Sequence, residues 1–158
     1  MVVLDCSVLS EMQCDSEKGR AARSLIYKNE KLIAPMLLQV EVCSVIRKLA
    51  LRNELPTNEP LAFAAEAIDM IDEFVPMEEL YQEALSESIR LRHSVYDVFY
   101  LVLARRTHAT LFTFDARLRE LCIENGVECL DEIEWPYDDA DEADEAARDG
   151  EDEGSQAE

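Results

Sequence analysis

The sequence predicts an α/β fold built on a short parallel sheet. Short apolar or β-branched runs recur at residues 2–4, 32–34, 110–114 and 127–130, and each is bounded by a charged residue or a proline. Longer stretches between them repeat apolar residues every three or four positions, which is typical of amphipathic helices. Because parallel neighbours need a crossover connection, strands that alternate with helices indicate a parallel sheet.

The helices follow from apolar spacing and from helix-start signals. We expect them over residues 16–27, 36–51, 61–71, 78–91, 95–106 and 116–124. Pro35 is suited to open the second of these, and Ser7 or Ser10 to cap a helix after the first strand. Ser94 and Asp97 form a variant of a capping box. Residues 74–76 form a further short strand whose proline predicts a place at the sheet edge.

Length and charge limit the organisation and the function. The 158 residues suffice for one domain with a core, and they carry a formal net charge of −20. Half of this charge lies in residues 138–158, which hold 11 acidic residues and one arginine. We expect residues 1–137 to form the domain and 138–158 a disordered acidic tail. The acidic body excludes a general nucleic-acid binder, because phosphate contacts need lysine and arginine.

Cellular location follows from what the sequence lacks. No apolar run approaches the roughly 20 residues of a membrane span, and residues 1–20 show no basic segment of a signal peptide. The five cysteines contain no CxxC pair, which indicates reduced thiols rather than a zinc or disulfide framework. We therefore expect a cytoplasmic protein with no membrane contact.

Two predicted strands are followed at once by an aspartate, Asp5 and Asp115. Ligands of open parallel sheets bind outside the carboxyl ends of the strands, where both side chains would lie. Glu41 and Asp97, each early in a predicted helix and flanked by valines, can reach the same edge. Taken singly, the two strand-end aspartates are ordinary helix N-caps, and Glu41 and Asp97 are ordinary solvated helix positions.

If the four carboxylates converge, they need a counter-charge. Two carboxylates ~6 Å apart repel each other by roughly 2–3 kcal/mol at an effective dielectric constant of about 20. Oxygen-only ligands suit Mg²⁺ or Mn²⁺ and disfavour zinc. Such a site would activate a water molecule and offset the charge that grows on a phosphodiester.

Four segments resemble the motifs of PIN-domain ribonucleases, especially VapC-type toxins, in the order of that family. The first is VVLDCSVL at residues 2–9, and the second is APMLLQVEV at residues 34–42. The third and most specific is SVYDVFYLVLA at residues 94–104, and the fourth is LFTFDARL at residues 111–118. The resemblance spans residues 1–130.

The resemblance implies a three-layer α/β/α PIN-like domain, a short parallel sheet with helices on both faces. It implies that Asp5, Asp97 and Asp115 bind one or two Mg²⁺ or Mn²⁺ ions, with Glu41 as a further ligand or as the base that orients water. Ser7 and Thr113 match small polar positions near the metal. The implied activity is endonucleolytic hydrolysis of RNA by metal-activated water. The implied role is the toxin of a type II toxin–antitoxin pair, a homodimer held inactive by a protein antitoxin.

Two other functions stay open on the same residues. The acidic charge favours a non-catalytic protein-binding module on a PIN fold, because it attracts basic partners and repels RNA. A receiver-like phosphoacceptor domain also gathers acids at strand ends, although the residues after Asp115 lack its lysine. The pairs Arg47-Lys48 and Arg105-Arg106 are solvated helix positions, contacts to an RNA backbone, or contacts to the carboxylates of a partner.

Overall fold

The computed structural model describes residues 1–26 and 30–130, and its centre is one parallel sheet of five strands in the order β3-β2-β1-β4-β5. The strands are β1 (Val2–Leu4), β2 (Leu32–Pro35), β3 (Glu73–Val75), β4 (Thr110–Phe112) and β5 (Cys129–Leu130). The helices are α1 (Cys6–Gln13), α2 (Glu17–Leu25), α3 (Leu37–Arg52), α4 (Pro60–Ile68), α5 (Met77–Leu91), α6 (Val95–Thr107) and α7 (Ala116–Glu124). The predicted parallel α/β sheet is confirmed.

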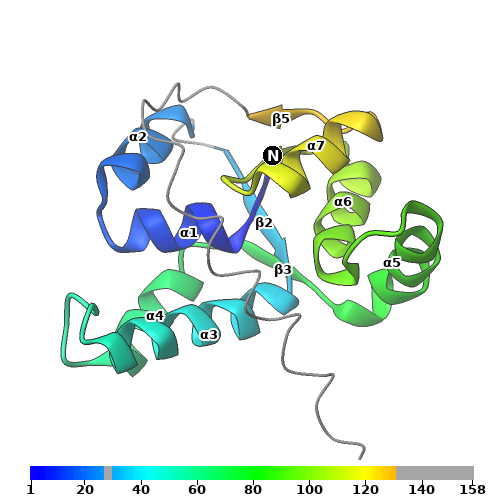
Figure 1. Ribbon diagram of the computed structural model, residues 1–158. Coiled ribbons are helices and arrows are strands. Elements are labelled where there is room, and N and C mark those ends of the chain that lie inside the picture. Colours follow the sequence, from blue (N-terminus) through cyan, green and yellow to red (C-terminus); the bar gives the residue numbers. More distant parts are fainter. Residues whose placement is uncertain (27–29, 131–158) are drawn as a thin grey trace, which may run out of the picture.

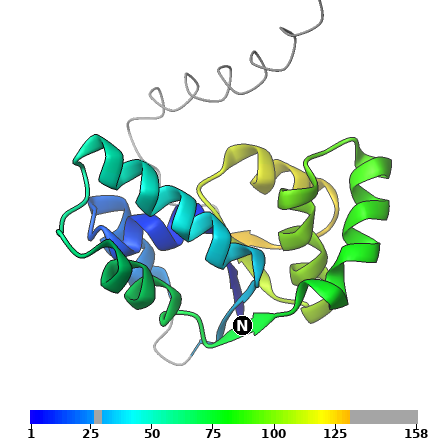
Figure 2. The same cartoon turned by 90° about the horizontal axis from the view of Figure 1, so that it is seen from below.

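The helices cover the sheet from both sides, as Figures 1 and 2 show. Helices α1 to α4 form one layer, in which α1 packs against the other three. Helices α5, α6 and α7 form the other layer, in which α6 lies against β1, β2 and β4. Leu4, Ile33 and Leu111 fill the sheet interior at no more than 2% exposure. The three-layer α/β/α architecture is therefore confirmed.

The order of the strands creates a switch point beside β1. The chain adds β2 and β3 on one side of β1 and then crosses to add β4 on the other side, where Leu4 pairs with Phe112. The carboxyl ends of β1 and β4 thus lie next to each other with their following loops turned apart, which is where open sheets bind ligands. Receiver domains have the different order 2-1-3-4-5, so the receiver-like alternative does not fit this sheet.

Local signals explain most element ends and fail at three of them. Asp5, and neither Ser7 nor Ser10, caps α1, because the first side-chain oxygen after the strand already reaches the amides of Cys6 and Ser7. Ser94 precedes α6 but its side chain makes no capping hydrogen bond, so the predicted capping box is wrong. Pro35 ends β2 instead of opening α3. The edge position predicted for the third strand is confirmed, since β3 is an outer strand of the sheet.

Two further expectations concern a membrane span and the end of the chain. None of the helices in the described ranges is long and apolar enough to cross a bilayer. The boundary predicted at residue 137 and the acidic tail predicted at 138–158 lie outside the described residues.

Gly19 allows α1 and α2 to approach each other. It lies in the first turn of α2, where its amide donates to the Ser16 hydroxyl at 2.9 Å. A Cβ on Gly19 would stand 2.0 Å from the carbonyl oxygen of Glu11 in α1. The obstacle is backbone, so it cannot turn aside as a side chain could.

We predict that Gly19→Ala destabilises the protein by about 1–3 kcal/mol, the usual consequence of overpacking. Thermal unfolding followed by circular dichroism measures it. Gly126→Asn is the control, because Gly126 has open space around it and a φ of 74° that asparagine tolerates. Equal melting temperatures for Gly19→Ala and the wild type would show that the two helices are not held at this distance.

Candidate active site

Asp5 is the buried centre of the site. It follows β1 directly and is 7% exposed. Its Oδ2 accepts hydrogen bonds from the Ser7 hydroxyl at 2.6 Å and the Thr113 hydroxyl at 2.8 Å, while its Oδ1 accepts from the Cys6 amide at 2.6 Å. Burial raises the pKa of the Asp5 carboxyl, and these hydrogen bonds only partly oppose the rise. The carboxylate is therefore held in one orientation but its charge is poorly compensated.

Ser7 and Thr113 join the ends of β1 and β4. The Ser7 hydroxyl accepts from the Phe114 amide at 3.0 Å, and the Thr113 hydroxyl accepts from the Asp115 amide at 3.0 Å. Each hydroxyl thus donates to Asp5 and accepts from the loop after β4. Thr113 is 2% exposed and Ser7 is half-buried, so the pair lies at the border of the interior. The resemblance implies that these two residues lie near the metal, and the structure places both hydroxyls against Asp5.

Glu41 reaches the site from α3, in the opposite helical layer from α6. Its Oε2 accepts a hydrogen bond from the hydroxyl of Tyr100 on α6. Burial, followed by the charges of Asp5 and Asp97, raises the pKa of Glu41 to about 7, although the Tyr100 hydrogen bond opposes the rise. The charges of Asp5 and Asp97 therefore act on Glu41, although the three side chains do not form a ready-made ligand cluster in the described residues.

Asp97 lies in the first turn of α6 and is about a quarter exposed. Nδ1 of His93, one turn earlier, is 3.2 Å from its Oδ2. That nitrogen is buried and has no hydrogen-bond partner among the described residues. The two atoms are therefore close, but they are not aligned for a hydrogen bond. The apolar run around Asp97 gave no sign of the histidine contact.

Asp115 differs from the other three acids in its exposure. It is exposed, and its Oδ1 accepts from the amides of Arg117 at 2.8 Å and Leu118 at 3.1 Å, which caps α7. Its link to the centre is through its backbone amide and Thr113. Both strand-end aspartates are thus helix N-caps, as the simpler interpretation predicts. Asp5 is in addition buried in the site.

The chemistry of the acidic side chains favours a metal ion, whereas their present spacing does not. Carboxylate oxygens are the ligands that Mg²⁺ and Mn²⁺ prefer, and burial and two neighbouring carboxylates raise the pKa of Glu41. Yet nowhere in the described ranges do three or more acidic, cysteine or histidine side chains stand close enough together to hold an ion. The residues fit a divalent cation by chemistry and charge, and their side chains would have to draw together around it.

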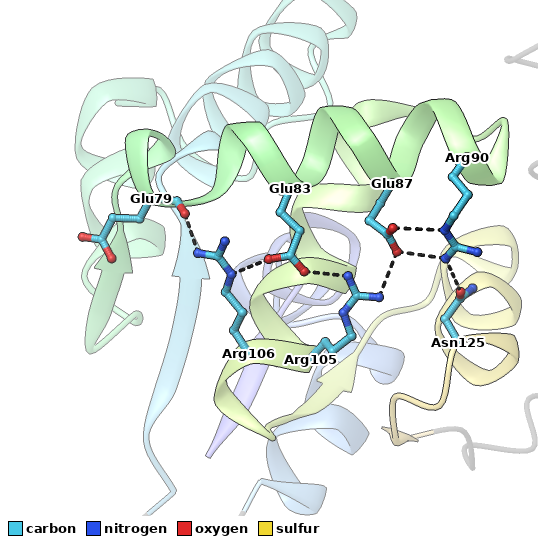
Figure 3. Close-up of polar contacts among 7 residues, drawn as sticks. All are labelled: Glu79, Glu83, Glu87, Arg90, Arg105, Arg106 and Asn125. Carbon is cyan, nitrogen blue, oxygen red and sulfur yellow. Dashed lines mark hydrogen bonds and ion pairs between the residues drawn. The ribbon is translucent and has the colours of Figure 1, made fainter.

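Arg105 and Arg106 lie in the last turn of α6, at the opposite end of the helix from Asp97, and they are paired with acids of the same layer. Arg105 on α6 contacts Glu83 at 2.6 Å and Glu87 at 2.9 Å on α5, and Arg106 contacts Glu83 at 2.6 Å (Figure 3). Hydrogen bonds from Arg90 and Arg105 lower the pKa of Glu87 to about 2. Arg105 and Arg106 thus pair with acids of their own chain, an outcome outside the uses considered for them above.

We predict that Glu41→Gln stabilises the protein in chelator-containing buffer above pH 7, by about 1–2 kcal/mol after allowance for partial exposure. The folded pKa of about 7 exceeds the ordinary 4.5, so the folded state loses stability as the pH rises from 4.5 through 7. The gain from glutamine should shrink below pH 7 and vanish below 4.5. Urea unfolding at pH 5 and pH 8 measures it, with exposed Glu54→Gln as the control. A gain independent of pH would contradict the burial of charge at Glu41.

Comparison with known proteins places the chain in a family. The PIN domain family matches residues 2–124. Ribonuclease VapC12 of Mycobacterium tuberculosis is 31% identical over 121 residues, which cover 76% of this chain and 91% of that protein.

Solved structures repeat the fold at lower identity. PAE2754 from Pyrobaculum aerophilum has a TM-score of 0.61 at 17% identity, covering 81% of this chain and 82% of its own. VapBC2 from Rickettsia felis, bound to a DNA fragment from its promoter, has a TM-score of 0.55 at 15% identity, covering 83% and 100%. The chain belongs to the PIN-domain family, and among curated proteins it is similar to a VapC ribonuclease.

Proposed function

We propose that this chain is a Mg²⁺- or Mn²⁺-dependent endoribonuclease and the toxin of a type II toxin–antitoxin pair. One observation carries the proposal: Asp5, Glu41 and Asp97 come from three different elements, and burial together with the charges of Asp5 and Asp97 raises the pKa of Glu41. Such charge is offset either by protonation or by a divalent cation, and we propose the cation. The similarity to a protein named ribonuclease VapC12 supports RNA as the substrate.

The four acids divide into two roles in the proposed reaction. Asp5, Asp97 and Asp115 would hold the cation, with Glu41 as a further ligand or as the group that orients the attacking water. A bound divalent cation lowers the pKa of water and offsets charge on the phosphoryl group. The Ser7 and Thr113 hydroxyls keep Asp5 in place, and a Glu41 carboxylate with a pKa near neutrality is suited to accept a proton.

We predict that Asp97→Asn lowers RNA cleavage by about 10²–10³-fold, the loss seen when one preorganised charge-stabilising group is removed. The assay incubates partner-free protein and structured RNAs with Mn²⁺ or with a chelator. Asp69→Asn makes the same change at an exposed acid next to α4 and should leave the rate unchanged.

The outcome separates the two candidate functions. Cleavage that requires Mn²⁺ and disappears in Asp97→Asn supports the nuclease. A folded wild-type protein that cuts no RNA with either ion would overturn it and favour the non-catalytic protein-binding module.

A protein antitoxin is the partner we propose for the toxin. The fold is shared with VapBC2 of Rickettsia felis and with FitAcB of Neisseria gonorrhoeae, the latter at a TM-score of 0.52 and 16% identity over 83% of this chain and 97% of its own. With this partner and substrate we propose a cytoplasmic location.

We propose that the protein is a homodimer joined through α5. Tyr81, Leu85 and Ile89 recur every fourth residue on this helix and are 50%, 55% and 70% exposed. Exposed Glu78 lies in the first turn of α5, before this apolar row, and exposed Arg92 is the C-cap residue that follows the helix. Two antiparallel copies would therefore pair the apolar rows and set Glu78 of each protomer against Arg92 of the other, which is a self-complementary two-fold contact.

We predict that Leu85→Glu makes the protein monomeric, because it puts a charge in the middle of the apolar row. Sedimentation velocity on the full chain measures the oligomeric state. Leu61→Glu is the matched control, since Leu61 is 86% exposed on α4, in the other layer. Higher salt should favour the wild-type dimer, because it screens repulsion between two chains that each carry −20. A dimer unaffected by Leu85→Glu would place the interface elsewhere.

A further inference from the structure

Tyr100 is a buried residue of α6 whose hydroxyl group lies at the acidic site. It follows Asp97 by three residues, so the two side chains lie on neighbouring positions of one helix face. The side chain is 1% exposed and is among the largest fully buried side chains of the protein. Its hydroxyl donates to Oε2 of Glu41, which lies 59 residues earlier on α3. This hydrogen bond links the two helical layers across the carboxyl edge of the sheet.

The acceptor that Tyr100 meets is unusual for a buried tyrosine. Any backbone carbonyl would satisfy a buried hydroxyl. Instead it meets a long, flexible acid that two other carboxylates repel. A hydrogen bond to a charged group is stronger than one between neutral groups, and it selects one arrangement of a side chain with three rotatable bonds. Glu41 therefore stays beside Asp5 and Asp97 rather than turning toward solvent.

The hydroxyl also fixes Glu41 without neutralising it. The donors to Asp5 and Glu41 are hydroxyls and backbone amides, and in the described ranges no lysine or arginine forms an ion pair with either acid. A cationic donor would bring its own positive charge and compete with a metal ion. Neutral donors orient the carboxylates and leave their negative charge available.

We propose that Tyr100 is a positioning residue that holds Glu41 for the divalent cation and the attacking water. The inference rests on the proposed nuclease function and adds to it a residue that acts through Glu41 and does not itself touch the substrate. The aromatic ring belongs to the core, and the hydroxyl serves the site.

The test compares Tyr100→Phe with Tyr96→Phe in the full-length protein. Both remove one hydroxyl from α6, but Tyr96 is 59% exposed. Mn²⁺ affinity is measured without RNA by electron paramagnetic resonance, and cleavage is measured at varied Mn²⁺ and RNA concentrations. We expect Tyr100→Phe to weaken Mn²⁺ binding about 10-fold or more, as loss of a group that orients a metal ligand does, and to lower kcat with little change in KM. Tyr96→Phe should match the wild type.

A double-mutant cycle shows whether the hydroxyl acts through Glu41. In a Glu41→Gln background, Tyr100→Phe should weaken Mn²⁺ binding no further. This background also keeps the measurement possible if Tyr100→Phe alone does not fold, because it removes the buried charge left without its donor. A further loss in the Gln background would overturn the proposal.

Two other results separate this inference from the nuclease proposal. If Tyr100→Phe lowers the melting temperature but keeps wild-type Mn²⁺ affinity and kcat, the hydroxyl is only structural and the inference fails while the nuclease stands. If the wild type binds Mn²⁺ and loses affinity in Tyr100→Phe but cuts no RNA, the nuclease fails and the positioning role stands.

Discussion

The arrangement of the site depends on keeping one carboxylate inside the protein at the junction of β1 and β4. Asp5 is the last point at which the central strand can carry a polar group before the chain turns into α1, and four donors from Cys6, Ser7 and Thr113 surround it. Those donors also join the two strand ends through Phe114 and Asp115. The same hydrogen bonds therefore fix the sheet edge, start α1 and orient the charge.

Sequence reasoning found the parts of the site that depend on local order. Asp5 and Asp115 could be predicted because an apolar strand stops at each of them, and a stop in a parallel sheet occurs at a known edge. The approach of Glu41 to Asp5 was only a possibility, because it depends on how α3 crosses the sheet. Asp115 looked equivalent to Asp5, yet it is exposed and caps α7. The difference arises because β4 ends at Phe112, so that Thr113 takes the buried position beside Asp5.

Two functional features were invisible for a different reason. Tyr100 stands in an apolar run and has the pattern of a core residue, and its acceptor lies 59 positions away. The partners of Arg105 were hidden because they belong to the preceding helix. Glu83 and Glu87 are four residues apart on α5, and they face Arg105 and Arg106 only once the two helices pack together (Figure 3). Patterns within one helix cannot show which charges a neighbouring helix will meet.

The stability of the first turn of α7 depends on the carboxylate of Asp115, which caps it. A carboxylate that serves as an N-cap contributes about 1 kcal/mol to its helix by accepting amide hydrogen bonds. If the same carboxylate is drawn toward an ion, the amides of Arg117 and Leu118 lose an acceptor. Occupancy of the site and fraying at the start of α7 are then thermodynamically linked, and amide hydrogen exchange at these two residues becomes a local reporter of what the site holds.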